Sequence, residues 1–108
     1  MGIPIQDCER TKATLNGSVI DKQGNPISNA EIYFENTPVD LSTPVKRTIY
    51  SDKTGHFGQE PIFFFKCEPI NFTIKAAGFR KKTVSYILDY GLRNSLPKEL
   101  NITLEKAQ

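Results

Sequence analysis

Hydrophobic and polar residues alternate with a period of two along several short stretches of the chain. In the clearest stretch, Ile70, Phe72 and Ile74 are separated by polar residues, which is the spacing that puts every second side chain of a β-strand on one face. Each such stretch predicts a strand with one face on a core and the other in water. The same reasoning predicts strands within 13–19, 30–35, 45–51, 82–87 and 100–104, a shorter one starting at His56, and another over the apolar run 62–65.

Turn-forming residues separate these stretches. Asp21–Pro26 and Asp52–Gly55 both combine an Asp, which can bond the backbone ahead of it, with a Gly that tolerates a positive φ. Residues 36–44, with two prolines, predict a long loop, and residues 88–98 fit either one turn of helix or an irregular loop. About seven short strands with turns between them predict two packed antiparallel sheets, an all-β sandwich.

The length of 108 residues fits one domain, since it can bury one core but not two. Residues 1–10 have no clear period and predict an extended N-terminal lead-in, and residues 11–108 predict a single β-sandwich domain. Apolar residues make up 38% of the chain and charged residues 24%, a mixture that favours a folded chain over a disordered one.

The charge balance argues against a nucleic-acid partner. The formal net charge is only +2, whereas binding to a phosphate backbone normally needs a strongly basic domain. No apolar run approaches the roughly 20 residues of a membrane-spanning helix, so no transmembrane segment is expected. The first residues also lack the basic-then-apolar pattern of a signal peptide, which leaves the location to be inferred from other features.

Cys8 and Cys67 are the two cysteines of the chain. They do not form a C-x-x-C pair, so neither a zinc half-site nor a redox motif is predicted. They could form a disulfide, which would close a loop of about 60 residues and contribute roughly 4 kcal/mol in the chain-entropy model, or they could be two separate buried thiols. Cys8 could instead carry a lipid, but Gln6 and Asp7 before it are not the small residues that lipoprotein processing requires.

Three motifs in order carry a resemblance to a known family. Residues 16–32 have the form Gly, apolar, Asp, Gly, Pro and then Ala before an apolar strand; residues 51–57 form a turn into an aromatic strand; and residues 72–79 form a strand that ends in Gly and an aromatic residue. Over residues 13–105 the chain therefore resembles the carboxypeptidase regulatory-like domains, which have a transthyretin-like (prealbumin-like) fold. The resemblance implies a seven-stranded Greek-key β-sandwich and a location outside the cytoplasm: the periplasm, the cell surface or the secreted fraction.

Nothing in the sequence predicts catalysis, a cofactor or a metal site. The transthyretin fold also includes a hydrolase of hydroxyisourate, whose site resembles two His and an Arg closed by a C-terminal Tyr-Arg-Gly-Ser, but His56 is the one histidine here and the chain ends differently. No nucleophile elbow is present. Asp21 and Asp52 open Asp-x-x-Gly turns that lack the alternating oxygen ligands of a calcium loop. We therefore expect that the protein is not an enzyme.

Two stretches are candidate interaction surfaces. Arg80, Lys81 and Lys82 form a basic cluster that could contact an anionic surface such as acidic lipid or polysaccharide, although such charges also serve to discourage strand pairing at a sheet edge. Phe63, Phe64 and Phe65 cannot all point inward from one strand, so at least one of them could contact a partner. Asn16, Asn71 and Asn101 begin formal glycosylation triplets, each at a predicted outward position.

The sequence-based hypothesis is a non-catalytic binding or structural module outside the cytoplasm that presents loops or a Phe-rich edge to a protein or carbohydrate partner. The alternative is a small carrier that binds a hydrophobic ligand at a homodimer interface, as transthyretin-like folds can do. Association with a membrane surface through the basic cluster also remains open. The sequence does not determine the partner or the oligomeric state.

Overall fold

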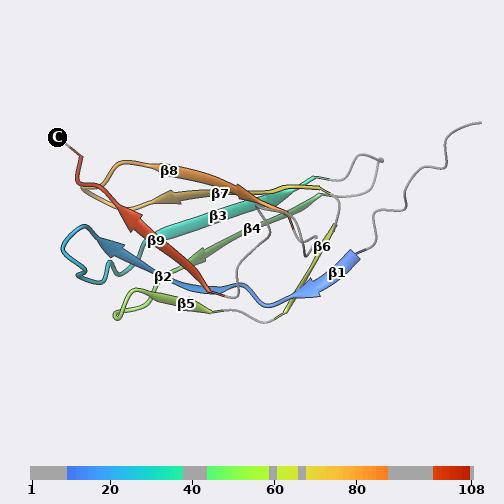
Figure 1. The fold of residues 1–108 in the computed structure, drawn as a ribbon, viewed down its shortest axis with the longest axis horizontal. Helices are drawn as coiled ribbons and strands as arrows, with labels where there is room; N and C mark the ends of the chain where they lie inside the picture. Colours follow the sequence, from blue (N-terminus) through green and yellow to red (C-terminus); the bar gives the residue numbers. More distant parts are fainter. Residues whose placement is uncertain (1–9, 38–43, 59–60, 66–67, 88–98, 108) are drawn as a thin grey trace, which may run out of the picture.

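The protein folds into strands and turns, shown in Figure 1. This computed structural model describes residues 10–37, 44–58, 61–65, 68–87 and 99–107. Within those residues it contains nine strands and no helix. The strands are β1 (Arg10–Ala13), β2 (Asn16–Asp21), β3 (Glu31–Asn36), β4 (Val45–Tyr50), β5 (His56–Gly58), β6 (Ile62–Phe65), β7 (Ile70–Lys75), β8 (Lys82–Tyr86) and β9 (Leu100–Leu104).

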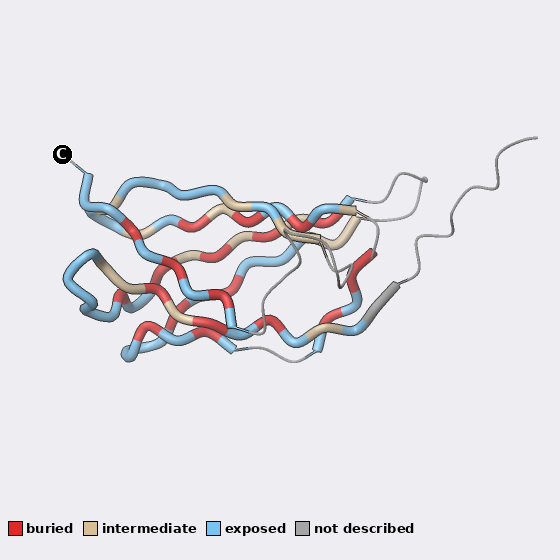
Figure 2. The backbone as a smooth tube through the Cα atoms, viewed as in Figure 1, coloured by how far each residue is buried: buried red, intermediate tan, exposed pale blue. Residues whose placement is uncertain are grey.

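The strands form three sheets, of which the two larger ones face each other across the core. One has the order β4-β3-β7-β8, the other has the order β5-β2-β9, and β1 pairs with β6 in a separate two-stranded sheet. Figure 2 shows buried positions alternating with less buried ones along the strands of both larger sheets, and exposed positions in the turns at their ends. The prediction of an all-β, sandwich-like fold is confirmed.

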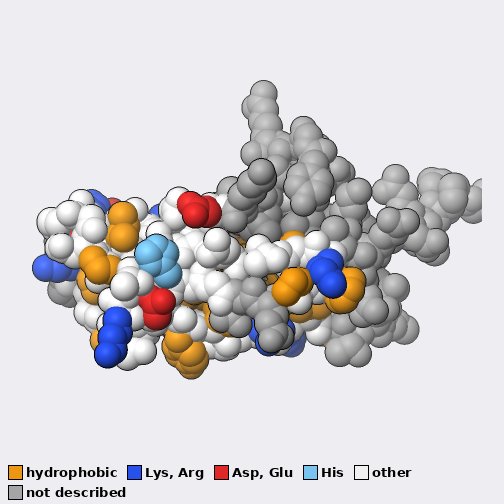
Figure 3. Space-filling model, turned by 90° about the horizontal axis from the view of Figure 1, so that it is seen from below, with side chains coloured by type: hydrophobic (Ala, Val, Ile, Leu, Met, Phe, Trp, Pro, Cys, Tyr) orange, Lys and Arg blue, Asp and Glu red, His pale blue; other side chains and the backbone are white. Residues whose placement is uncertain are grey.

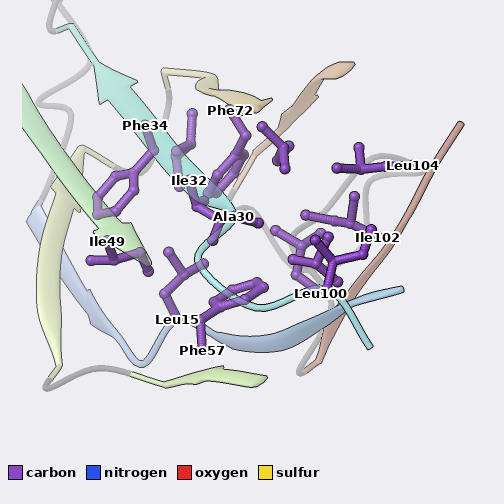
Figure 4. Close-up of a cluster of buried hydrophobic side chains, with 14 of the residues drawn as sticks. Leu15, Ala30, Ile32, Phe34, Ile49, Phe57, Phe72, Leu100, Ile102 and Leu104 are labelled. Atoms are coloured by element: carbon purple, nitrogen blue, oxygen red, sulfur yellow. The ribbon is translucent and has the colours of Figure 1, made fainter. Parts of the chain in front are cut away.

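The alternation in the sequence explains which side chains face the core. In β3, β7 and β9 every second residue is buried, and the residues between are half-buried or exposed, as expected for strands with one face on a core. Figure 4 shows side chains from both larger sheets meeting in one cluster. From these three strands the buried hydrophobic side chains are Ile32, Phe34, Ile70, Phe72, Ile74, Leu100, Ile102 and Leu104.

Aromatic rings extend the core to the small β1-β6 sheet. The ring centroid of Phe34 lies 5.7 Å from that of Phe64 and 5.8 Å from that of Phe72, and the ring of Tyr86 meets Phe72 edge-on at 6.1 Å. These distances are within the range in which aromatic pairs attract one another beyond the area they bury. This series of ring contacts therefore connects β6 to β3, and β3 in turn to β7 and β8.

Two details of the predicted fold are wrong. The described residues hold nine strands in three sheets rather than seven in two, because β1 and β6 pair with each other outside the larger sheets. The pairing is also not wholly antiparallel, since β2 and β9 run parallel, with Gly17 opposite Leu100. Strands far apart in the sequence can pair in either direction, and period-two alternation is the same in both cases.

Candidate functional site

The open edge of the sandwich brings together three segments that are distant in the sequence. Strand β8 ends one sheet and β9 ends the other, and Figure 1 shows the start of β8 and the end of β9 at the same end of the molecule. The turn after β2 lies there as well, because Lys22 in that turn forms an ion pair with Glu105, with 3.1 Å between Nζ and Oε1. A site at this edge draws on both sheets.

Backbone hydrogen bonds join the turn between β7 and β8 to the residues that follow β9. The turn closes through the amide of Phe79, which donates to the carbonyl of Ala76, and Gly78 adopts a φ of 83° that favours glycine. The amide of Arg80 then donates to the carbonyl of Glu105 at 2.8 Å, and the amide of Ala107 donates to the carbonyl of Gly78 at 2.9 Å. These bonds hold the basic run beside the end of β9.

A groove of about 340 Å³ lies at this junction, and four of its seven lining residues are Lys or Arg. Its walls contain Lys22, Arg80, Lys81 and Lys82, together with Thr103–Glu105. Four positive charges against one carboxylate give the lining a formal charge of +3. A partly enclosed surface of one sign concentrates oppositely charged ligands near it, so the groove favours an anion.

Two contacts organise the charges in the groove. Lys82 lies opposite Ile74 on β7 and so starts on the core-facing side of its sheet; its ammonium crosses to the other sheet and donates to the carbonyl of Thr103 at 3.2 Å. The hydrogen bond from Lys22 lowers the pKa of the Glu105 carboxyl, and the charges of Lys22, Arg80 and Lys82 lower it further. Glu105 is therefore ionised at neutral pH and is the acceptor in the groove.

The structure places only part of the predicted interaction surface in this groove. Arg80, Lys81 and Lys82 line it, but β6, which carries the three phenylalanines, lies toward the other end of the molecule in Figure 1. Phe64 and Phe65 are buried, whereas Phe63 is 49% exposed, with the Lys12 ammonium 5.5 Å from its ring centroid. Lys22, Thr103 and Glu105 were not predicted from the sequence. Nothing in a sequence shows that a turn near the start of the chain will lie beside a strand near its end.

His56, the one histidine of the chain, lies on an open surface at the start of β5 (Figure 3). Its Nδ1 lies 2.8 Å from the hydroxyl of Thr54, and that hydroxyl lies 2.7 Å from the Asp52 carboxylate. Asp52 also accepts the backbone amides of Thr54 and His56. All of these bonds lie within one tight turn, and each has a structural role there, as predicted for an Asp-x-x-Gly turn.

Acid is expected to destabilise the turn at Asp52, and the substitution Asp52→Asn tests this expectation. The hydrogen bonds from Thr54, side chain first, lower the pKa of the Asp52 carboxyl in the folded state. A lowered folded-state pKa stabilises the protein above the unfolded-state pKa, and that contribution is lost as the pH falls through the folded-state value. Melting temperatures measured from about pH 5 to about pH 2 should therefore fall less steeply for Asp52→Asn than for the unmodified protein.

The asparagine keeps an oxygen that can accept the amides of Thr54 and His56, so the Asp52→Asn variant should remain folded at pH 7. The comparison is between the slopes of melting temperature against pH for the two proteins, and not between their absolute stabilities. Equal slopes for variant and unmodified protein would show that the Asp52 charge does not contribute to stability in this turn.

The described part of the chain contains no group of three or more His, Cys, Asp or Glu residues that could hold a metal ion. Among the same residues no helix is long and apolar enough to cross a membrane. The candidate disulfide between Cys8 and Cys67 lies outside the described residues, and so do most of the 36–44 loop and all of the ambiguous 88–98 segment. The disulfide stays a prediction.

Solved structures with a similar fold include 1,2-dioxygenases of aromatic diols. A 3-chlorocatechol 1,2-dioxygenase from Rhodococcus opacus 1CP aligns with a TM-score of 0.69 and 12% identity over 95% of this chain and 63% of its own. The catechol 1,2-dioxygenase of Acinetobacter radioresistens aligns with a TM-score of 0.69 and 14% identity over 93% of this chain and 53% of its own. The hydroxyquinol 1,2-dioxygenase of Pseudomonas putida DLL-E4 aligns with a TM-score of 0.65 and 15% identity over 92% of this chain and 58% of its own. No family model and no curated protein sequence matches the chain.

These matches establish a shared fold, and the chain spans less than two thirds of the length of the dioxygenases it aligns with. They overturn the assignment to the carboxypeptidase regulatory-like family. The motifs behind that assignment, such as 51–57, consist mainly of turn residues, and turn residues specify the geometry of a sandwich rather than its family.

The predicted function is corrected with the family. The non-catalytic module or carrier rested on the family resemblance and the missing catalytic residues, and the expectation that the protein is not an enzyme rested on those missing residues. The matched structures of this fold are enzymes, so neither prediction is kept. The expected location outside the cytoplasm and the expected partners stay predictions, because neither the fold nor the matches bear on them.

Proposed function

We propose that this chain provides the β-sandwich of an enzyme that acts on catechol-like aromatic diols. One observation supports the proposal: dioxygenases of catechol, chlorocatechol and hydroxyquinol all align with more than nine tenths of the chain. In this role the sandwich is the rigid scaffold from which strands and loops present the groups that bind the diol.

The chemistry of such an enzyme sets a requirement that the described residues do not meet. In proteins, reactions of dioxygen are carried by haem, flavin, copper or non-haem iron. In a large class of oxygenases the non-haem iron is held by two imidazoles and one carboxylate. His56 is the one histidine of the chain and lies in a surface turn with Thr54 and Asp52. The described residues therefore do not fit a metal of this kind, and the proposal assigns them the scaffold and not the reacting group.

For the topology we propose that the seven strands of the two larger sheets form a Greek key, as the family resemblance implied, but with β2 and β9 parallel. Support comes from the order of the strands, because the chain crosses between the two sheets from β2 to β3, from β4 to β5 and from β8 to β9. Crossings of this kind, instead of a run of simple hairpins, are typical of Greek-key sandwiches.

Consumption of dioxygen tests the proposed enzyme. The complete protein is supplied in turn with iron(II) and iron(III) and then with catechol, and dioxygen uptake is followed with an electrode. The proposal expects protein-dependent uptake of one dioxygen per catechol consumed, and much slower uptake with resorcinol, whose hydroxyls are not adjacent. Each metal without protein measures the background oxidation of the diol. Uptake no faster than that background would contradict the proposal.

A further inference from the structure

The groove between β8 and β9 is the strongest candidate for a ligand site among the described residues. It combines a volume of about 340 Å³ with four cations from two separate segments. Ligand pockets in proteins begin at roughly this size, about 300 Å³. We propose that this groove binds a small ligand that carries one oxyanion group, a phosphate or a carboxylate, next to hydroxyl groups.

The cations account for the oxyanion. Arg80 and Lys81 lead directly into Lys82, the first residue of β8. The backbone hydrogen bond from Arg80 to Glu105 holds the first residue of this run beside the end of β9. A guanidinium presents paired donors that match two oxygens of a phosphate or carboxylate, and an ammonium adds a point charge. Hydrogen bonds to charged groups of this kind are stronger than neutral ones, so the oxyanion is the group that the run would hold.

The other wall accounts for the hydroxyl groups and limits the size of the ligand. Glu105 is an ionised acceptor that pairs with Lys22 at 3.1 Å and also feels the charges of Arg80 and Lys82. The Thr103 carbonyl already accepts from Lys82. A long polyanion would place a second negative charge against Glu105, whereas a hydroxyl group can donate to it. This arrangement favours a sugar-sized ligand with one charged group.

Titration followed by NMR tests the proposal with three soluble probes: glucose 6-phosphate, glucuronate and glucose. The amide signals of Lys22, Arg80–Lys82 and Thr103–Glu105 should shift and saturate with at least one of the two anionic probes, and glucose should cause no saturating shift. Saturation with the phosphate alone or with the carboxylate alone identifies the group that the site takes. The affinity should weaken as salt is added, because exposed charges are screened.

Paired variants separate this site from the general charge of the surface. The double variant Arg80→Gln and Lys82→Gln should weaken binding by about tenfold or more, since it removes two charge-assisted contacts. The matched variant Arg47→Gln and Lys53→Gln removes the same charges on and just after β4, the opposite edge of that sheet, and should stay within about twofold of the unmodified protein. Equal weakening by both variants would overturn the proposal.

A second variant keeps the test decisive if the first one unfolds. Glu105→Gln removes the negative charge from the groove but keeps an oxygen acceptor, so it should bind the anionic probes more tightly. Vesicles of phosphatidylcholine with 30% phosphatidylserine and free heparin are the remaining probes. Binding to either of these without saturable binding of the sugar phosphate or glucuronate would overturn the small-ligand proposal and point instead to a charged surface patch.

Discussion

Replacement of Gly17 by alanine is expected to destabilise the protein by at least about 3 kcal/mol, since overpacking commonly costs 1–3 kcal/mol and backbone overlap costs more. A Cβ at this position would lie 1.9 Å from the carbonyl oxygen of Leu100 and 2.8 Å from the ring of Phe57. The oxygen belongs to the backbone of β9, so it cannot move without separating the parallel pair of β2 and β9. Such a loss is a large part of the roughly 5–15 kcal/mol that stabilises a typical domain.

Urea unfolding followed by circular dichroism measures this loss. Gly58→Ala is the matched control, because Gly58 lies in the neighbouring strand β5 and a Cβ there would meet only the side-chain oxygen of Asn16, at 3.4 Å. The control should change the free energy of unfolding by less than about 1 kcal/mol. If Gly17→Ala and Gly58→Ala were equally stable, the close approach of β2 to β9 would be contradicted.

Replacement of Asn36 by leucine should cost about 3 kcal/mol, because it leaves several buried polar groups without a partner. Asn36 is fully buried at the end of β3. Its side-chain oxygen accepts the amide of Phe65 at 2.5 Å, and its side-chain nitrogen donates to the carbonyls of Glu68 and Pro69 at 3.2 and 3.1 Å. The Asn36 side chain thus links Phe65 of β6, and Glu68 and Pro69 after it, to the four-stranded sheet.

The variant Asn36→Asp shows whether the side-chain donor of Asn36 contributes to stability, or only its acceptor. The carboxylate keeps an acceptor for Phe65 but places negative charge against the carbonyl oxygens of Glu68 and Pro69. Chemical unfolding at pH 7 and at about pH 4 should therefore find the variant relatively more stable at the acid pH, where a protonated carboxyl can donate again. A free energy of unfolding close to that of the unmodified protein for Asn36→Leu would show that this network contributes little.

The strands that the sequence predicts most clearly are those with one buried face. In β3, β7 and β9 the apolar residues recur at every second position, and the burial of Ile32, Phe72 and Ile102 follows from that alternation alone. Strand β1 gave no such signal, since Arg-Thr-Lys-Ala does not alternate; it is a strand because its backbone pairs with β6. Pairing between distant segments decides such a strand, and local sequence does not report it.

The candidate groove was visible in the sequence only as the basic run Arg80–Lys82. Its other wall depends on the bond between Arg80 and Glu105 and on the ion pair between Lys22 and Glu105, which form only once β9 lies along the open edge. The family was misassigned for a related reason. Turn motifs such as 51–57 recur wherever a sandwich reverses direction, so they predict the fold well and the function poorly.

The source of the oxygen atoms in the product tests the proposed enzyme most directly. The complete protein, supplied with iron and catechol, is incubated under ¹⁸O₂ in unlabelled water, and the products are analysed by mass spectrometry. The account predicts a ring-opened product that carries both labelled oxygen atoms, formed in proportion to the protein present. Only quinone-type products, at the rate found with iron alone, would contradict the assignment of this sandwich to a diol dioxygenase.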